Sequence, residues 1–161
     1  DYTGDLWTRQ IAIDTSNLRM IERIFKTKGY PGKTLVGTPT NTAAWYVIQH
    51  SNKIGEYLAL IKEAGKEDEL PFRLVAMMED RYLMEQGKMQ IYGTQGMTYN
   101  NTPNMIWPIE DSENVNKRRE EAGFSQTIEQ YGKDLFGDDF EYEVLTLEQA
   151  EKRRLASIPN N

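Results

Sequence analysis

Apolar side chains recur at helical spacing along most of this chain. The clearest case is Leu18, Ile21 and Phe25, which lie at positions i, i+3 and i+7. A broader apolar face follows Pro71 and ends before Gly87, which is typical of a central helix. Helices are predicted at about residues 6–13, 16–28, 39–52, 54–64, 72–86, 112–123, 124–135 and 147–156.

The helix boundaries are predicted from capping residues. Asp14 or Ser16 is expected to cap the second helix, and Thr38 is expected to cap the third, with a proline after it. Thr146 and Gln149 have the spacing of a capping box, which predicts where the last helix begins.

Alternation with a period of two residues replaces helical spacing in three short segments. Met89–Tyr92 and residues 105–109 alternate as strands do, and Pro108 confines the second of them to a sheet edge. Between them, Gly93–Pro103 is predicted to be a loop. A third strand is suggested by the alternation of Phe140, Tyr142 and Val144.

These patterns predict a predominantly α fold of the α+β class. We expect a compact helical domain with a small antiparallel β-hairpin or three-stranded sheet. The length of 161 residues fits a single domain. Residues 1–137 are expected to form this domain, with the hairpin near 89–109. Residues 138–161 are expected to form a C-terminal strand–helix extension, either separate or part of the same domain.

The charge balance argues against a nucleic-acid partner. The chain has 25 acidic and 19 basic residues, and its formal net charge is −6. Proteins that bind nucleic acids usually carry a basic face, but here the densest basic run, Lys117–Arg119, is followed directly by Glu120 and Glu121. We therefore predict that this run is a solvated helix face. No apolar stretch is long enough for a membrane helix, so no membrane span is predicted.

The sequence has no cysteine and one histidine, His50. Disulfides, thiolate zinc sites, a cysteine nucleophile and a zinc motif with two histidines are therefore excluded. Neither a phosphate-binding loop nor a calcium loop is complete, so no cofactor and no metal is predicted. No signal peptide is recognisable, and the chain begins at Asp1. We expect a soluble protein, either cytoplasmic or exported with its signal removed.

Two polar pairs interrupt the apolar helices and supply candidate catalytic residues. Gln49 and His50 end an apolar helix. Histidine side chains in general titrate near neutral pH and can move a proton in either direction, so His50 is the candidate general acid or base. Asp80 and Arg81 each lie three residues after a methionine of the apolar face, so both are expected near the core. Arg81 would hold an anion while Asp80 acts as a base or orients the histidine. The alternatives are a structural histidine and a buried ion pair.

A third polar cluster follows the first predicted strand. In a strand, Gln90 and Tyr92 point to the same side, opposite Met89 and Ile91, and therefore face outward or into a cleft. Tyr92 would serve as a proton donor or as a stacking surface. The alternative is an exposed hairpin with ordinary polar residues. The predicted ligand-binding residues are Gln49, Gln90, Tyr92, Thr94 and Gln95.

The order of these motifs resembles that of an uncharacterised bacterial family classed as a domain of unknown function. The matching positions are Asp14-x-x-Asn17-Leu18, Gly29-Tyr30-Pro31, Val36-Gly37, Trp45, Gln49-His50, Asp80-Arg81, Gln90-x-Tyr92-Gly93-Thr94-Gln95, Pro108-Ile109 and Arg118-Arg119 with Gly123. The family often has a tryptophan at the position of Tyr30 and Gly-Leu at Gly123-Phe124. The resemblance implies a domain of this type and carries no mechanism with it.

Two functions, with different ligands, follow from these residues. The first is a cofactor-independent hydrolase or transferase that acts on an anionic small molecule, with His50, Asp80 and Arg81 as catalytic residues. The second is a binding module that presents the 93–103 loop and an edge strand to a peptide, glycan or protein partner. This second hypothesis places Trp107 on the exposed surface. A purely structural part of a larger protein is the third alternative.

Overall fold

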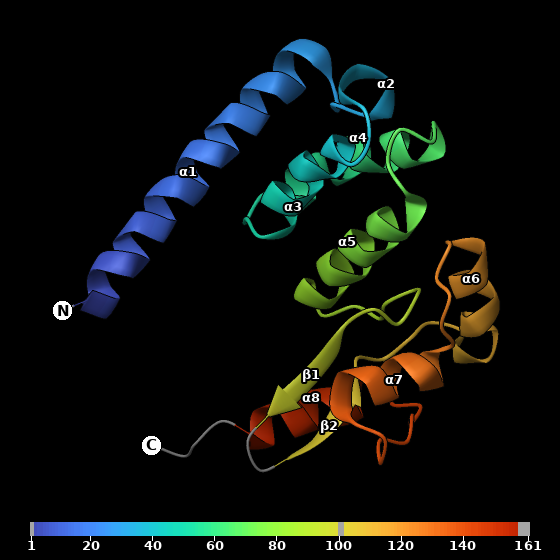
Figure 1. The fold of residues 1–161 in the computed structure, drawn as a ribbon. Helices are drawn as coiled ribbons and strands as arrows, with labels where there is room; N and C mark the ends of the chain where they lie inside the picture. Colours follow the sequence, from blue (N-terminus) through green and yellow to red (C-terminus); the bar gives the residue numbers. More distant parts are fainter. Residues whose placement is uncertain (1, 100–101, 158–161) are drawn as a thin grey trace. The chain divides into compact units, whose positions relative to one another are not determined.

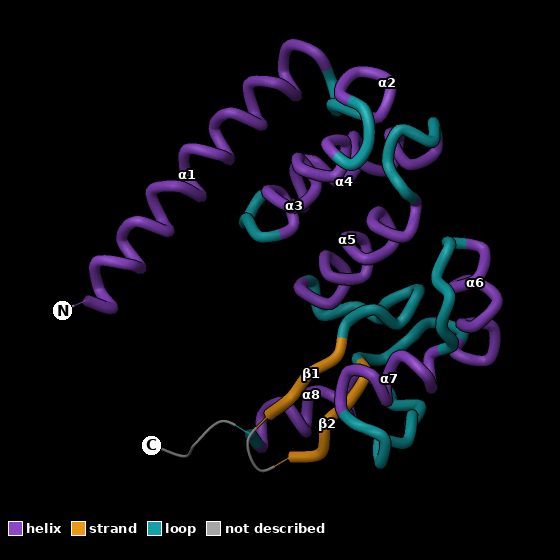
Figure 2. Tube along the Cα trace, in the orientation of Figure 1, coloured by secondary structure: helices purple, strands orange, loops and turns teal. Residues whose placement is uncertain are grey.

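The computed structural model describes residues 2–99 and 102–157. The chain forms two compact units, residues 1–75 and 76–161, and the boundary lies inside helix α5 (Phe72–Glu85). Among the described residues, helices predominate and both strands belong to the second unit (Figure 2). The protein is therefore a predominantly helical α+β protein with an antiparallel hairpin, as the sequence predicted. The predicted division into residues 1–137 and 138–161 stays a prediction.

The first unit is helical. It opens with the long helix α1 (Tyr2–Lys28), which Figure 1 shows in dark blue. The shorter elements that follow are α2 (Lys33–Val36), a 3-10 turn (Thr40–Thr42), α3 (Ala43–Gln49) and α4 (Ile54–Lys66). In none of the described helices do length and apolar character together reach what a membrane span requires.

Helix α1 is continuous where the sequence predicted two helices. Residues 5–28 contain neither proline nor glycine, so nothing in the backbone requires a break. The carboxylate of Asp14 accepts a hydrogen bond from Gln10 Nε2 (2.8 Å), one turn earlier in the same helix, instead of capping a new one. The predicted cap at Asp14 or Ser16 is therefore wrong.

The third predicted helix also begins later than its pattern indicated. The hydroxyl of Thr42 donates to the carbonyl of Pro39 (2.9 Å), and this contact lies within a 3-10 turn. Helix α3 then begins at Ala43. The predicted N-cap at Thr38 is wrong, because a separate 3-10 turn stands between it and the helix.

The core of the first unit is built by its helices and the first turn of α5. Trp45 is buried, and its Nε1 donates to the carbonyl of Leu74 (2.8 Å). A Cβ on Gly65 would lie 2.5 Å from Val75 Cγ2, so the missing side chain lets α4 approach α5 closely. Other large buried side chains of this unit include Phe25, Ile48, Ile54, Ile61, Leu70 and Leu74.

The second unit contains the hairpin, which pairs β1 (Gly96–Tyr99) with β2 (Thr102–Ile106). An antiparallel hairpin was predicted, but β1 lies inside the segment predicted to be a loop, so the predicted strand positions are wrong. The N–H groups of residues 91, 92 and 94 bond to a side chain of α5 and so cannot pair with a neighbouring strand. Gln90 keeps one strand-like contact, an isolated parallel bridge to Ile109.

Two helices pack on opposite faces of the hairpin (Figure 1). Helix α7 (Ile128–Phe136) covers the face of Ile106, whereas α8 (Leu147–Ala156) covers the face of Met105, because successive strand residues point to opposite sides. Both helices begin with a capping box, and the one predicted at the start of α8 is confirmed. Helix α6 (Val115–Glu121), preceded by a 3-10 turn (Ser112–Asn114), completes the unit.

The predicted third strand is not formed among the described residues, whose sheet has two strands. Phe140 and Tyr142 are partly buried against the cluster that contains Ile106 and Ile128. Their alternation with exposed residues therefore reflects a half-buried segment of irregular structure, and no ladder of backbone hydrogen bonds accompanies it in the described chain.

Candidate functional site

Asp80 is the centre of the polar network in the second unit. It lies in α5 and is completely buried. Its carboxylate accepts hydrogen bonds from the backbone N–H groups of Ile91 (2.7 Å), Tyr92 (3.1 Å) and Thr94 (2.9 Å). The hydroxyl of Thr94 donates to the same carboxylate (3.0 Å). One side chain therefore holds the whole turn after residue 90.

Gln90 completes the turn from its other end. Its Nε2 donates to the carbonyl oxygens of Trp107 (2.6 Å) and Gln95 (3.0 Å), and its Oε1 accepts from the N–H of Gln95 (2.9 Å). The side chain is fully buried, and its amide nitrogen and oxygen both have backbone partners. The structure thus brings Asp80, Gln90, Thr94 and Gln95 together.

Two arginines that the sequence placed on a solvated face belong to this network. Arg119 is 1% exposed, and it donates to the carbonyls of Tyr92 (2.9 Å) and Gln126 (2.9 Å). Its guanidinium also lies 4.8 Å from the ring centre of Phe124. Arg118 donates from Nε to the carbonyl of Ile91 (3.0 Å). The predicted solvated face is wrong for these two residues, because the carbonyl groups of Ile91 and Tyr92 in the adjacent turn accept their hydrogen bonds.

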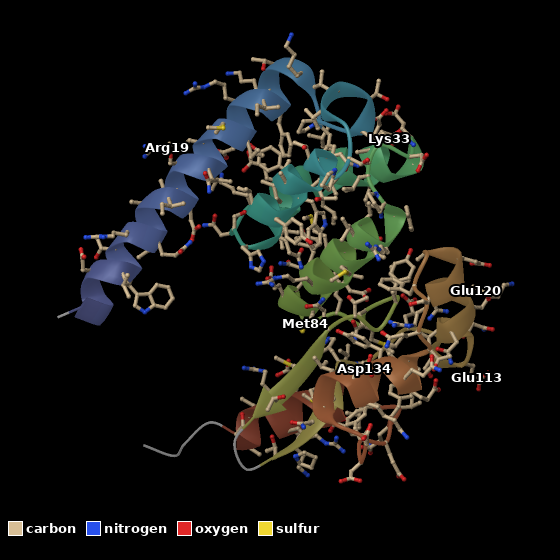
Figure 3. All side chains as sticks on the ribbon, viewed as in Figure 1. Arg19, Lys33, Met84, Glu113, Glu120 and Asp134 are labelled. Carbon is tan, nitrogen blue, oxygen red and sulfur yellow. The ribbon has the colours of Figure 1, made fainter. Side chains whose placement is uncertain are left out.

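Burial and hydrogen bonding shift the pKa of Asp80, at the centre of this network, in opposite directions. Burial raises the pKa of Asp80, and the N–H donors of residues 91, 92 and 94 partly offset that effect. Burial lowers the pKa of Arg119 and raises that of Tyr131, whose hydroxyl donates to the carbonyl of Thr94 (2.8 Å). Figure 3 shows how densely side chains fill this part of the second unit, near the labelled Met84 and Asp134.

Arg81 and Tyr92 lie at the border of the network. Arg81 Nε is 3.1 Å from Glu85 Oε1, one turn along α5; the side chain of Arg81 is partly exposed and that of Glu85 is exposed. The side chain of Tyr92 is half-buried, and its pKa is raised by burial and by the nearby carboxylate of Glu79. The buried ion pair between α5 and the hairpin, which was one alternative, is not formed by the described residues: the partners of Asp80 are N–H and hydroxyl donors, and Arg81 pairs with Glu85 of its own helix.

Trp107 has a different position from the one that the interaction hypothesis required. It is 2% exposed, and its Nε1 donates to the carbonyl of Lys88 (2.8 Å). The expectation of an exposed Trp107 is therefore wrong. Its indole ring belongs to the cluster under α8, together with Met105 and Leu145.

Gln49 and His50 belong to the first unit. Gln49 is 6% exposed, and its Oε1 has no hydrogen-bond partner among the described residues. His50 is exposed and forms the C-cap of α3, where its N–H bonds to the carbonyl of Tyr46 (3.3 Å). At the end of α3, Gln49 therefore lies in the interior and His50 lies on the surface.

His50 lines a groove between α1 and α3 with a volume of about 690 Å³. Sequence reasoning did not find this groove, because its two sides are distant along the chain. Trp7 and Tyr46 are both more than half exposed and supply aromatic surface. The described residues that line it are Trp7, Gln10, Asp14, Thr15, Asn17, Leu18, Tyr46, Val47, His50, Ser51 and Asn52.

The fold and these two sites define an α+β protein with an open groove in one unit and a closed polar network in the other. Residues 2–144 match the model of the Family of unknown function (DUF6624), and the chain belongs to this family. Searches of the curated proteins and of the solved structures found no match.

Proposed function

We propose that this protein binds a small molecule in the groove between α1 and α3. The observation that supports this proposal is the convergence of an exposed histidine, a carboxylate and two exposed aromatic rings on one groove. Its volume of about 690 Å³ lies within the range of ligand pockets, roughly 300–1,000 Å³. The polar groups of His50, Asp14 and Asn17 would orient the ligand, while Trp7 and Tyr46 would contact its apolar part.

The groove chemistry favours a neutral or cationic ligand with a flat apolar part. Among the described residues, the lining contains one carboxylate, Asp14, and neither lysine nor arginine. Aromatic faces attract cations, so Trp7 and Tyr46 also favour a cationic ligand. The proposal departs from the expected anionic ligand, which depended on Arg81, because Arg81 is paired with Glu85.

If the ligand of this groove is a substrate, the reaction that we propose is hydrolysis or group transfer. His50 would then move the proton, since it is exposed and an imidazole can both accept and donate a proton. We assign Asp80 a positioning role for the turn at residues 90–95, because its carboxylate is already occupied by hydrogen bonds.

The test compares two aromatic probes of similar size and opposite charge, 2-phenylethylamine and 3-phenylpropanoate. Each is titrated into ¹⁵N-labelled protein, and amide shifts of residues in α1 and α3 are followed. We expect the amine to bind with a Kd on the order of 1 mM and the carboxylate at least about tenfold more weakly.

Variants separate the groove from the rest of the surface. Asp14→Asn should weaken amine binding about threefold to fivefold, the size of an exposed charge pair. His50→Gln should also weaken it, with an unchanged melting temperature because the ring is exposed. Asp138→Asn, which removes the same charge in the second unit, is the matched control. Equal binding of both probes, or equal loss in the control variant, would reject the proposal.

A further inference from the structure

A second groove of the first unit lies between α1 and α4 and has a volume of about 490 Å³. This volume, too, lies within the range of small-molecule pockets, roughly 300–1,000 Å³. The described residues that line it are Glu22, Arg23, Phe25 and Lys26 from α1, and Tyr57 and Leu60 from α4. None of them lines the groove between α1 and α3, so the two grooves are separate.

The floor of this second groove is apolar. The ring centres of Phe25 and Tyr57 are 5.0 Å apart, and the rings meet edge to face. Phe25 is buried, whereas Tyr57 and Leu60 are partly exposed. Because Leu60 follows Tyr57 by three residues, the two side chains are neighbours on one side of α4. Together they offer apolar surface to a small hydrocarbon group.

The charged side chains of the groove leave two cations uncompensated. The carboxylate of Glu22 accepts a hydrogen bond from the hydroxyl of Tyr57 (3.2 Å), and the Nζ of Lys53 lies 3.9 Å from the same oxygen. Arg23 and Lys26 are exposed and form no ion pair with another described residue. They are three positions apart on α1, so their side chains lie on neighbouring parts of the helix surface.

The same part of α1 is basic although the whole chain is acidic. Residues 15–28 contain four basic residues and one acidic residue, whereas the formal net charge of the chain is −6. Basic side chains in the last turn of a helix also favour its carbonyl end, which accounts for Lys26 and Lys28. Arg23 lies before the last turn, where that effect is small. The local field therefore attracts an anion to the groove.

We propose that the groove between α1 and α4 binds a small phosphate monoester that carries an apolar group. The guanidinium of Arg23 donates two parallel hydrogen bonds to phosphate oxygens, and the ammonium of Lys26 supplies the second positive charge for a dianion. The apolar group lies against Tyr57 and Leu60. This site does not rest on the function proposed for the groove between α1 and α3.

The experiment titrates three probes into the ¹⁵N-labelled full chain: phenyl phosphate, benzyl alcohol and inorganic phosphate. The amide shifts of Tyr57 and Leu60 are followed, because α4 does not line the groove between α1 and α3. We expect phenyl phosphate to bind with a Kd on the order of 1 mM. The other two probes should bind at least about fivefold more weakly, because benzyl alcohol lacks the charge and inorganic phosphate lacks the apolar group.

Variants of α1 locate the site. Arg23→Gln should weaken binding of phenyl phosphate about threefold to fivefold, the size of an exposed charge pair. The matched control is Arg19→Gln, which removes the same charge from the exposed surface of the same helix (Figure 3) and should change the affinity by no more than about 1.5-fold. The double variant Arg23→Gln with Lys26→Gln should bind phenyl phosphate no more tightly than benzyl alcohol. Both side chains are exposed, so the melting temperature should not change.

Four results would overturn the inference. Equal losses in Arg23→Gln and Arg19→Gln would reduce the effect to the overall charge of the helix. Shifts in α3 without shifts in α4 would place the phosphate in the other groove. Binding of inorganic phosphate as tight as that of phenyl phosphate would mean a nonspecific anion site. Cosedimentation with phosphatidylcholine vesicles that contain phosphatidic acid, lost in Arg23→Gln, would make a membrane headgroup the ligand instead of a small molecule.

Discussion

At the scale of single residues, two neighbours in α5, Asp80 and Arg81, differ in burial and in the kind of partner that they bond to. Asp80 is buried and accepts from three backbone N–H groups and one hydroxyl, whereas Arg81 is partly exposed and pairs with the exposed Glu85. A buried acceptor with several donors is sensitive to any change of its atoms, because each donor left without a partner costs free energy. An exposed ion pair contributes little.

Asp80→Asn should therefore lower the free energy of unfolding by about 2–4 kcal/mol, since an amide NH₂ would face N–H donors. The matched change Arg81→Gln should cost no more than about 0.5 kcal/mol. Urea denaturation of both variants provides the comparison. Similar losses in the two would contradict the structural role of the carboxylate.

At the scale of elements, the turn at residues 90–95 packs directly on α7. Gly93 has a φ of +70°, and a Cβ there would lie 2.5 Å from Ile128 Cδ1 and 2.7 Å from Ile109 Cδ1. Gly87, after α5, has a similar φ of +67°, but nothing lies within 4 Å of the position of its Cβ. Both glycines have a positive φ, which favours glycine, but only Gly93 has neighbouring side chains where a Cβ would lie.

Gly87→Ala should cost about 1–2 kcal/mol for its left-handed backbone, and Gly93→Ala about 2–5 kcal/mol because overpacking adds to the same strain. The midpoints of urea unfolding measure both. If Gly93→Ala lowers the free energy of unfolding no more than Gly87→Ala does, the turn can move away from α7 with little loss of stability.

At the scale of the whole molecule, carboxylates in the two units make stability depend on pH with opposite sign. Glu69 accepts bonds from the N–H (2.8 Å) and hydroxyl (2.5 Å) of Thr34, which lower its pKa below 4.5. Its contribution is present above pH 4.5 and is lost as pH falls through the lowered pKa. Burial raises the pKa of Asp80 above 3.8, so this group disfavours folding as pH rises from 3.8 towards the raised value.

Glu69→Gln should therefore reduce the loss of stability between pH 5 and pH 3, an interval chosen to span roughly the pKa of an ordinary glutamate. Unfolding free energies across that interval give the slope. Glu67→Gln, a change at an exposed glutamate nearby, serves as the control and should leave the slope as in the wild type. If both variants have the same slope as the wild type, the bonds to Thr34 do not favour the ionised carboxylate.

The helices were largely predictable because their signals are local. The periodicity of α4 and α5 and the capping box of α8 each lie within one element. The boundary errors occurred where a possible cap went unused, as at Asp14, which bonds within α1 instead. The hairpin was predicted, but its strands were displaced, because Asp80 takes the N–H groups that a ladder would have used.

The sequence by itself determined the helical class, the absence of cysteine and histidine-pair chemistry, and which polar residues interrupt the apolar pattern, because each of these depends on residue type or short spacing. The tertiary structure alone decided what those residues do. Asp80 accepts hydrogen bonds from N–H groups 11 to 14 positions away, and Arg119 donates to carbonyls 7 and 27 positions away. His50 and Asp14 line the same groove. Contacts over such distances depend on how helices pack, and no local pattern in the chain encodes that packing.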